Sequence, residues 1–232
     1  MIRKLMPSPI RVRHSEYSML FCADDDLSYP PPEHLISLAI QAITKAPGVS
    51  LGDVSMRMSS PPYYPNIWPG EHYKLLAAIV LTLKPKLVVE IGTATGLSVL
   101  SLKKYASQQS KIVTFDIIPW KSFPNKCLKE DDFTDGRLVQ YIDDLSDNKV
   151  FLKYSGLLKE ADMIFIDAAK DGVMEQKFID NFRTITFNSR PLIIFDDIRL
   201  WNMLKIWRDI TLPKLDLTSF GHWSGTGIVE WS

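Results

Sequence analysis

One stretch of nine residues, 88–96, constrains the fold of this chain more than any other. It reads V-V-E-I-G-T-A-T-G, an apolar run that ends in an acid and then meets two glycines. The next residues, 97–102, have the pattern of the first turns of a helix. Gly92 permits a tight turn, and Gly96 is expected to leave space where a ligand approaches the backbone. Strand, glycine turn and helix together are the layout of a nucleotide-type cofactor site. An ordinary strand-to-helix turn has the same pattern.

Further apolar runs that end in acids follow along the chain, at 112–116, 138–144, 163–167 and 192–197. Runs of this length without polar alternation are typical of strands buried on both faces of a parallel sheet. Helical patterns lie at 97–108, 148–159, 174–186 and 199–211, and two strand-like segments, 215–220 and 227–231, come last. We therefore expect a Rossmann-like α/β fold. It has a seven-stranded, mostly parallel sheet with helices on both faces and a C-terminal antiparallel β-hairpin.

The first 70 residues differ from the rest, and we expect them to form an N-terminal helical and loop cap on a main domain spanning 71–232. A helix is predicted between Pro32, which fits a first turn, and Pro47-Gly48, which ends it. Residues 59–70 form a stiff loop rich in proline and aromatic side chains. Several aromatic residues can line a ligand pocket or pack in the core, and the sequence leaves both open: Tyr63, Tyr64, Trp68 and Trp120.

Composition excludes several classes of protein. Hydrophobic residues make up 46% of the 232 residues, which allows a core of ordinary size. Lys plus Arg and Asp plus Glu are equal at 27 each, so no overall charge favours nucleic acid or an anionic membrane. No apolar run approaches the ~18 residues that span a bilayer, and the start resembles no secretory signal. With only Cys22 and Cys127, far apart, we expect a reducing, cytoplasmic location.

The acids at the strand ends are candidate ligand-binding residues, because ligands bind at the carboxyl ends of strands in open α/β sheets. Asp116 stands where an acid accepts hydrogen bonds from two ribose hydroxyls. Asp144 is placed to accept from an adenine amine, with Asp143 as the competing choice. Glu90 can orient the glycine loop or bind an ammonium group. Each acid taken alone can also be a helix cap or a turn residue.

A second group of acids, Asp167, Asp196 and Asp197, follows two strands that we expect to be neighbours. Magnesium prefers carboxylate oxygens, so these three side chains predict a divalent-cation site. Lys170 comes three residues after Asp167. Near a metal it can act as a general base, while the competing interpretation is a surface lysine paired with Asp171.

These residues resemble motifs of the class I S-adenosylmethionine-dependent methyltransferases, and within them the metal-dependent catechol and caffeoyl-coenzyme A O-methyltransferases. The resemblance covers about residues 70–232. Residues 90–96 match E-I-G-x-x-x-G, and 167–171 match D-x-x-K-D, in which the aspartate binds the metal and the lysine is the proposed base. Asp196-Asp197 stands where the family has D-N. The resemblance implies cofactor-binding roles for the following residues: Glu90, Gly92, Thr93, Gly96, Ser98, Asp116 and Asp144.

The expected function is therefore methyl transfer from S-adenosylmethionine to a small hydroxylated molecule. One interpretation of the aromatic residues is that this molecule is itself aromatic. Asp167 and Lys170 are the expected catalytic residues, with Mg²⁺ or another divalent cation on Asp167, Asp196 and Asp197. The resemblance also implies a homodimer. Three alternatives stay open: a metal-independent methyltransferase acting on another nucleophile, a nicotinamide-dependent oxidoreductase, and a binding module without turnover. His222 is either a second candidate base or a hydrogen-bonded turn residue.

Overall fold

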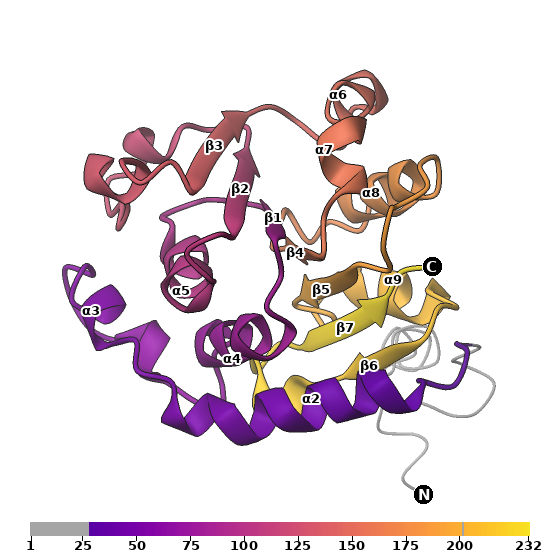
Figure 1. The fold of residues 1–232 in the computed structure, drawn as a ribbon, viewed down its shortest axis with the longest axis horizontal. Helices are drawn as coiled ribbons and strands as arrows, with labels where there is room; N and C mark the ends of the chain where they lie inside the picture. Colours follow the sequence, from indigo (N-terminus) through magenta and orange to yellow (C-terminus); the bar gives the residue numbers. More distant parts are fainter. Residues whose placement is uncertain (1–27, 201) are drawn as a thin grey trace, which may run out of the picture.

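A single seven-stranded sheet forms the centre of the protein (Figure 1). The computed structural model describes residues 28–200 and 202–232, so Cys22 lies outside it. The strands are β1 Leu87–Ile91, β2 Lys111–Asp116, β3 Leu138–Ile142, β4 Met163–Ile166, β5 Leu192–Asp196, β6 Lys214–Asp216 and β7 Thr226–Glu230. Their order is β3-β2-β1-β4-β5-β7-β6, in which β1 to β5 are parallel and the β6–β7 pair is antiparallel. The predicted fold class is confirmed.

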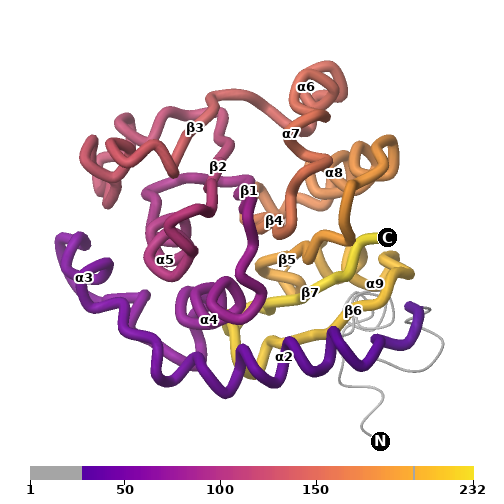
Figure 2. The backbone as a smooth tube through the Cα atoms, in the orientation of Figure 1, coloured from indigo at the N-terminus to yellow at the C-terminus, as the bar shows by residue number. Residues whose placement is uncertain are grey.

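Helices cover both faces of the sheet (Figure 2). They are α2 Glu33–Lys45, α3 Gly52–Ser55, α4 Tyr73–Leu83, α5 Leu97–Tyr105, α6 Asn148–Lys153, α7 Ser155–Lys159, α8 Met174–Phe182 and α9 Met203–Asp209, with short 3₁₀ turns at Ala46–Gly48, Tyr64–Asn66, Trp120–Ser122, Glu130–Phe133 and Thr218–Phe220. Side chains of α2, α4 and α5 share one hydrophobic core, and those of α8 and α9 share another. Alternate residues of β1 enter the two cores, Val88 on one face and Val89 on the other. Within the described ranges, no helix combines the length and apolar character needed to cross a membrane.

Two predicted segments differ from the structure. The helix expected over 148–159 is interrupted at Tyr154, whose φ of −100° and ψ of 5° leave the helical region. The strand expected over 215–220 ends at Asp216, because its carboxylate accepts hydrogen bonds from the backbone N–H and hydroxyl of Thr218 and so forms a turn. Neither change alters the order of the strands.

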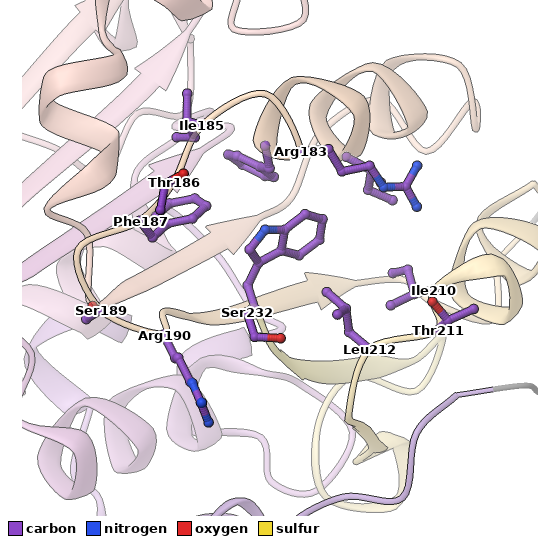
Figure 3. A pocket seen from close by; sticks show the side chains of 13 residues that line it. Arg183, Ile185, Thr186, Phe187, Ser189, Arg190, Ile210, Thr211, Leu212 and Ser232 are labelled. Atoms are coloured by element: carbon purple, nitrogen blue, oxygen red, sulfur yellow. The ribbon is translucent and has the colours of Figure 1, made fainter.

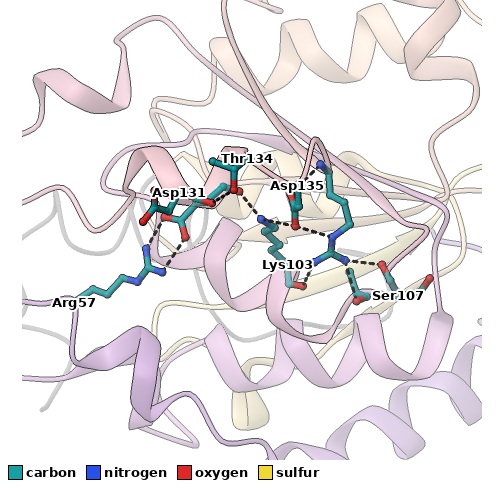
Figure 4. Close-up of polar contacts among 9 residues, drawn as sticks. Arg57, Lys103, Ser107, Asp131, Thr134 and Asp135 are labelled. Atoms are coloured by element: carbon teal, nitrogen blue, oxygen red, sulfur yellow. Dashed lines mark hydrogen bonds and ion pairs between the residues drawn. The ribbon is translucent and has the colours of Figure 1, made fainter.

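The segment before residue 70 packs closely on the sheet domain. In α2, Leu35, Ala39 and Ala42 are buried in the core that also contains α4 and α5. Beyond α3, the guanidinium of Arg57 donates to both carboxylate oxygens of Asp132, at 2.5 and 2.8 Å (Figure 4). This bidentate pair joins the N-terminal segment to the 3₁₀ turn at Glu130–Phe133. A division of the chain at residue 70 stays a prediction.

Candidate functional site

A cavity of about 280 Å³ lies at the carboxyl ends of the parallel strands. Four of the predicted site residues line it, one from each of four strand ends: Gly92, Asp116, Asp144 and Asp167. Apolar side chains, among them Phe115 and Ile117, complete the wall. A cavity with an apolar wall and a few acids at this edge is suited to a ligand with both an apolar and a hydroxyl-bearing part.

The glycine loop is held by packing against other parts of the protein. Gly92 has a φ of +106°, and a Cβ at this position would lie 2.0 Å from the carbonyl oxygen of Asp167. Gly96 has a φ of +90°, and its Cβ would lie 2.3 Å from Cγ of Leu128. Both positions therefore require glycine. Packing against Leu128 is enough to require glycine at position 96, so the approach of a ligand to its backbone stays a prediction.

Glu90 is fully buried beneath the glycine loop. Its Oε2 accepts a hydrogen bond of 2.5 Å from the hydroxyl of Thr114, which in turn contacts the hydroxyl of Thr93 at 2.7 Å. Burial raises the pKa of Glu90 to about 8, although hydrogen bonds from Ser98 and Thr114 act in the opposite direction. Thr93 and Ser98 are buried too and are not among the residues that line the cavity. Their side chains thus act on Glu90 and not directly on the cavity.

Asp116 connects the glycine loop to the end of β2. Its Oδ2 accepts from the backbone N–H of Ala94 at 2.8 Å, and its Oδ1 accepts from that of Ile118 at 2.9 Å. A carboxylate oxygen accepts more than one hydrogen bond, so both atoms can still bind the hydroxyls of a ligand. The expected hydroxyl-binding role therefore fits the position of Asp116 on the cavity wall.

Asp143 and Asp144 both line the cavity but have different hydrogen-bond partners. The carboxylate of Asp143 accepts from Lys153 Nζ at 2.9 Å and from the hydroxyl of Tyr154. Asp144 accepts from the backbone N–H of Ser146 at 2.8 Å. Both bonds to Asp143 end on Oδ2, so Asp143 and Asp144 each keep an oxygen for a ligand, and the choice of Asp144 for the ligand amine stays a prediction.

The three predicted metal-binding carboxylates come together. Asp167, Asp196 and Asp197 each offer an oxygen, and these oxygens lie within 4.8 Å of one another. The ammonium of Lys170 contacts Asp167 and lies 3.0 Å from Oδ2 of Asp197. Lys170 therefore points into this cluster and does not pair with Asp171 as a surface lysine would. Lys170 and Asp197 both have a φ of +58°, a conformation that is uncommon for non-glycine residues and that recurs at functional sites.

Burial and neighbouring charges together shift the pKa values of Lys170 and Asp167. Burial acts to lower the pKa of Lys170, but the carboxylates of Asp167 and Asp197 outweigh it and raise that pKa above its ordinary value. The pKa of Asp167 is raised, first by burial and then by the neighbouring charge of Asp196. The ammonium of Lys170 is therefore held firmly between two acids.

Two histidines flank Asp196, and sequence reasoning missed the first of them. His72 Nδ1 lies 3.2 Å from Oδ1 of Asp196, and His222 Nδ1 lies 3.3 Å from its Oδ2. Burial acts to lower the pKa of His222, but Asp196 and Asp197 raise it to about 10. Burial also acts to raise the pKa of Asp196, yet His72 and His222 lower it. No local motif marks His72, which directly precedes α4.

Comparison with solved structures identifies the fold. The SAH-bound methyltransferase of Podospora anserina matches with a TM-score of 0.51 and 17% identity, over 98% of each chain. A protein assigned as an O-methyltransferase in Klebsiella pneumoniae matches with a TM-score of 0.50 and 16% identity, over 88% of this chain and 92% of that one. The chain has the fold of these methyltransferases. No protein-family model matches the sequence, and neither does any curated protein.

Other pockets lie elsewhere in the described structure, and two of them bear on the position of the site. The first, about 560 Å³, lies at the opposite edge of the sheet, where Arg183, Phe187 and Leu212 line it (Figure 3). It contains none of the predicted site residues. The second, about 360 Å³, lies between the aromatic loop and the glycine loop, with Tyr64 and Thr95 in its wall. Of the remaining aromatic residues, Trp120 is buried and stacks on Phe133 with ring centroids 5.7 Å apart, and Trp68 packs against the core.

Proposed function

We propose that this protein is an S-adenosylmethionine-dependent methyltransferase that, with the help of a divalent cation, methylates a hydroxyl group of a small molecule. The position of Asp167 carries this proposal. Asp167 lines the cavity at the glycine loop and also belongs to the cluster of three carboxylates. One side chain thus joins a cofactor-type cavity to a group of acids with catalytic potential. Methyl transfer needs this proximity, because the acceptor oxygen, the methyl carbon and the sulfur must be aligned.

The residues around the cavity fit the cofactor. Asp116 offers two carboxylate oxygens for the ribose hydroxyls, and Asp144 offers an acceptor for the adenine amine. Glu90 has one buried oxygen, Oε1, without a hydrogen-bond partner. Such an atom is costly unless a donor satisfies it, and the cofactor's ammonium group can donate a hydrogen bond to it.

The carboxylate cluster fits a hard divalent cation, since Asp167, Asp196 and Asp197 offer oxygen atoms only. A cation bound there would lower the pKa of an acceptor hydroxyl and of the Lys170 ammonium. Lys170, as the free amine, takes the hydroxyl proton while the acceptor oxygen forms its bond to the methyl carbon. The bond between that carbon and the sulfonium sulfur breaks, and S-adenosylhomocysteine is the second product.

The 360 Å³ pocket is the proposed acceptor site. Tyr64 and Tyr73 line it, and Thr95 of the glycine loop forms part of the same wall. Tyr73 directly follows His72 in the chain and packs against it, with ring centroids 4.3 Å apart. Aromatic walls beside the glycine loop favour a flat, hydroxylated aromatic acceptor.

One observation favours a second candidate, a methyltransferase that works without a metal. The ammonium of Lys170 contacts two of the three carboxylates and supplies positive charge where a cation would bind. In that case a nucleophile other than an activated hydroxyl is the better acceptor. A nicotinamide-dependent oxidoreductase is less favoured, because the E-x-G-x-x-x-G loop differs from the G-x-G-x-x-G of dinucleotide sites.

The decisive experiment has two stages. Calorimetric titration with S-adenosylhomocysteine and with NAD tests the cofactor, and we expect binding of the first only. Turnover of S-adenosylmethionine is then measured on a panel of catechols and other phenols, with Mg²⁺ and with EDTA. Activity lost in EDTA and restored by Mg²⁺ supports the proposal. Full activity in EDTA supports the metal-independent alternative, and binding of NAD alone refutes both.

A further inference from the structure

We propose a second cation site, formed by His72, Asp196 and His222, which binds a divalent transition-metal ion such as Zn²⁺. The three side chains each offer one ligand atom, and these atoms lie within 4.8 Å of one another. The inference goes beyond the proposed methyl transfer and does not rest on it, because metal content can be measured whether or not any acceptor is methylated.

The distances between the ligand atoms match those of a metal site. His72 Nδ1 and Asp196 Oδ1 are 3.2 Å apart, and His222 Nδ1 and Asp196 Oδ2 are 3.3 Å apart. Bond lengths of about 2.0–2.2 Å to nitrogen and oxygen in a tetrahedral site place neighbouring ligand atoms about 3.3 Å apart. The two contacts reach different oxygens of Asp196, so side-chain rotation must bring one ligand atom of each residue onto the ion, from positions that already lie within 4.8 Å of one another.

Buried atoms without partners provide independent support. Nε2 of His72 is buried without a hydrogen-bond partner, and buried Nδ1 of His72 and Oδ1 of Asp196 make no hydrogen bond and have only their mutual ion-pair contact at 3.2 Å. His72 is 3% exposed and Asp196 is 2% exposed. Leaving buried polar atoms unsatisfied costs about 1–3 kcal/mol each, so several at one place indicate a missing ligand. A cation would satisfy Oδ1 of Asp196 and one nitrogen of His72 together.

The fold holds the two histidines in place from distant parts of the chain. Gly70 donates its N–H to the carbonyl of Gly221 at 3.0 Å and accepts from the N–H of Trp223 at 3.0 Å. This pairing fixes the loop that carries His222 beside the start of α4, where His72 lies. The rings of His72 and His222 lie edge to face, with centroids 5.4 Å apart. Asp196 enters from the end of β5, so three separate elements supply the ligands.

Neighbouring acids favour a bound cation. Nε2 of His222 lies 3.8 Å from the carboxylate of Glu71, which can orient the ring from its far side as outer-shell carboxylates do in metal sites. A competing interaction also exists, since His222 Nδ1 lies 3.0 Å from Asp197 and 2.9 Å from the hydroxyl of Ser224. A purely hydrogen-bonded His222 is thus the alternative that an experiment must exclude.

The donor set predicts the type of ion. Two imidazole nitrogens and one carboxylate favour Zn²⁺, Fe²⁺ or Co²⁺, whereas Mg²⁺ prefers oxygen atoms alone. The group Asp167, Asp196 and Asp197 offers oxygen atoms alone and therefore suits Mg²⁺. Because Asp196 belongs to both groups, a substitution there cannot tell them apart. The histidines belong only to the proposed transition-metal site, and Asp167 belongs only to the other.

The test is calorimetric titration of chelator-treated full-length protein with Zn²⁺ in a buffer that contains millimolar Mg²⁺. We expect the wild type to bind one Zn²⁺ per chain, and His72→Gln and His222→Gln to bind it at least tenfold more weakly. His34→Gln is the control and should bind as the wild type does, and Asp167→Asn, which removes a nearby charge but no ligand, should weaken binding less than either histidine variant. His34 pairs with Glu230 at 2.5 Å on the surface, so it tests whether loss of any histidine weakens binding.

A second measurement avoids variants, because substitution of the buried His72 side chain also perturbs the packing around it. In the Co²⁺-loaded wild type, proton NMR should show two exchangeable, strongly shifted imidazole N–H signals. The proposal is refuted if the wild type binds no Zn²⁺ in the presence of Mg²⁺, or if folded His222→Gln binds as the wild type does. It is also refuted if His34→Gln weakens binding equally, or if the Co²⁺ protein lacks the two signals. If His72→Gln fails to fold, His222→Gln and the NMR spectrum decide.

Discussion

Gly92 lies so close to Asp167 that any β-carbon at position 92 would meet the carbonyl oxygen of Asp167 at 2.0 Å. The contact joins the end of β1 to the end of β4 at the point where the cavity and the carboxylate cluster meet. A backbone atom cannot rotate away as a side chain can. The first glycine of the loop is thus required by the packing of the sheet edge, whatever the ligand.

We expect Gly92→Ala to lower the free energy of unfolding by about 3 kcal/mol, from the backbone clash together with the positive φ. Urea denaturation measures the change. Gly136→Ala is the matched control, since Gly136 has a φ of +70° and open space where a Cβ would lie. It should lose only about 1 kcal/mol. Equal losses in the two variants would contradict the packing argument.

The space at Gly96 gives a second prediction. A Cβ there would meet the side chain of Leu128, which can be shortened. We expect Gly96→Ala and Leu128→Ala each to lower the free energy of unfolding. The double variant should lose less stability than the two single losses added together, by about 1 kcal/mol or more. Urea denaturation of all four proteins measures the coupling. Simple additivity would show that Leu128 does not restrict position 96.

Asp116→Ala should weaken the binding of S-adenosylhomocysteine by about 10- to 100-fold, the effect of losing a charged hydrogen-bond partner. The loss also frees the N–H of Ala94, which Asp116 binds at 2.8 Å. Calorimetric titration gives the affinity. Asp135→Ala removes a carboxylate that pairs with Lys103 at 2.9 Å away from the cavity, and it should bind as the wild type does. Unchanged affinity in Asp116→Ala would remove Asp116 from the site.

The strands and the acids at the cavity could be predicted because their signals are local. Short apolar runs mark buried strands, and the residue after each run lies at the carboxyl edge of a parallel sheet. Asp116 and Asp167 were therefore recognised from their own surroundings in the sequence. Lys170 needed the D-x-x-K-D resemblance, because a lysine three residues after an acid is equally common on a surface.

What the sequence did not show depends on contacts between distant segments. His72 lies beside Asp196 through contacts between distant segments, among them the pairing of Gly70 with the loop around His222, and no short motif encodes such contacts. The same holds for Gly96, whose neighbour Leu128 lies in a different segment. Such relationships follow from tertiary packing, which local patterns of residues do not specify.

Lys170→Met tests the base role. We expect methyl transfer to fall by about 10²- to 10⁴-fold, the usual contribution of a general base, with little change in the affinity for S-adenosylhomocysteine. Lys170→Arg should not restore activity, because a guanidinium is not deprotonated in proteins. Lys177→Met on the exposed face of α8 is the control and should keep full turnover. Turnover close to that of the wild type in Lys170→Met would exclude Lys170 as the base.

The raised pKa of Glu90 predicts how the free energy of unfolding depends on pH. Its folded-state pKa is raised from 4.5 to about 8 by burial, so the folded protein holds this proton more tightly than the unfolded chain does. The stabilisation is complete below pH 4.5 and is lost as the pH rises towards 8, by up to about 1.4 kcal/mol per pH unit. Glu90→Gln cannot ionise, so its stability should rise relative to the wild type across this window and level off above it.

Urea denaturation of both proteins at several pH values between 4.5 and 9 measures this difference. Glu33→Gln removes the same charge from an exposed position in the first turn of α2, and its difference from the wild type should stay nearly constant. Parallel curves for Glu90→Gln and the wild type would show that Glu90 is ionised in the folded protein at neutral pH. The unpartnered Oε1 would then have to be a charged acceptor, which burial makes far more costly than a neutral one.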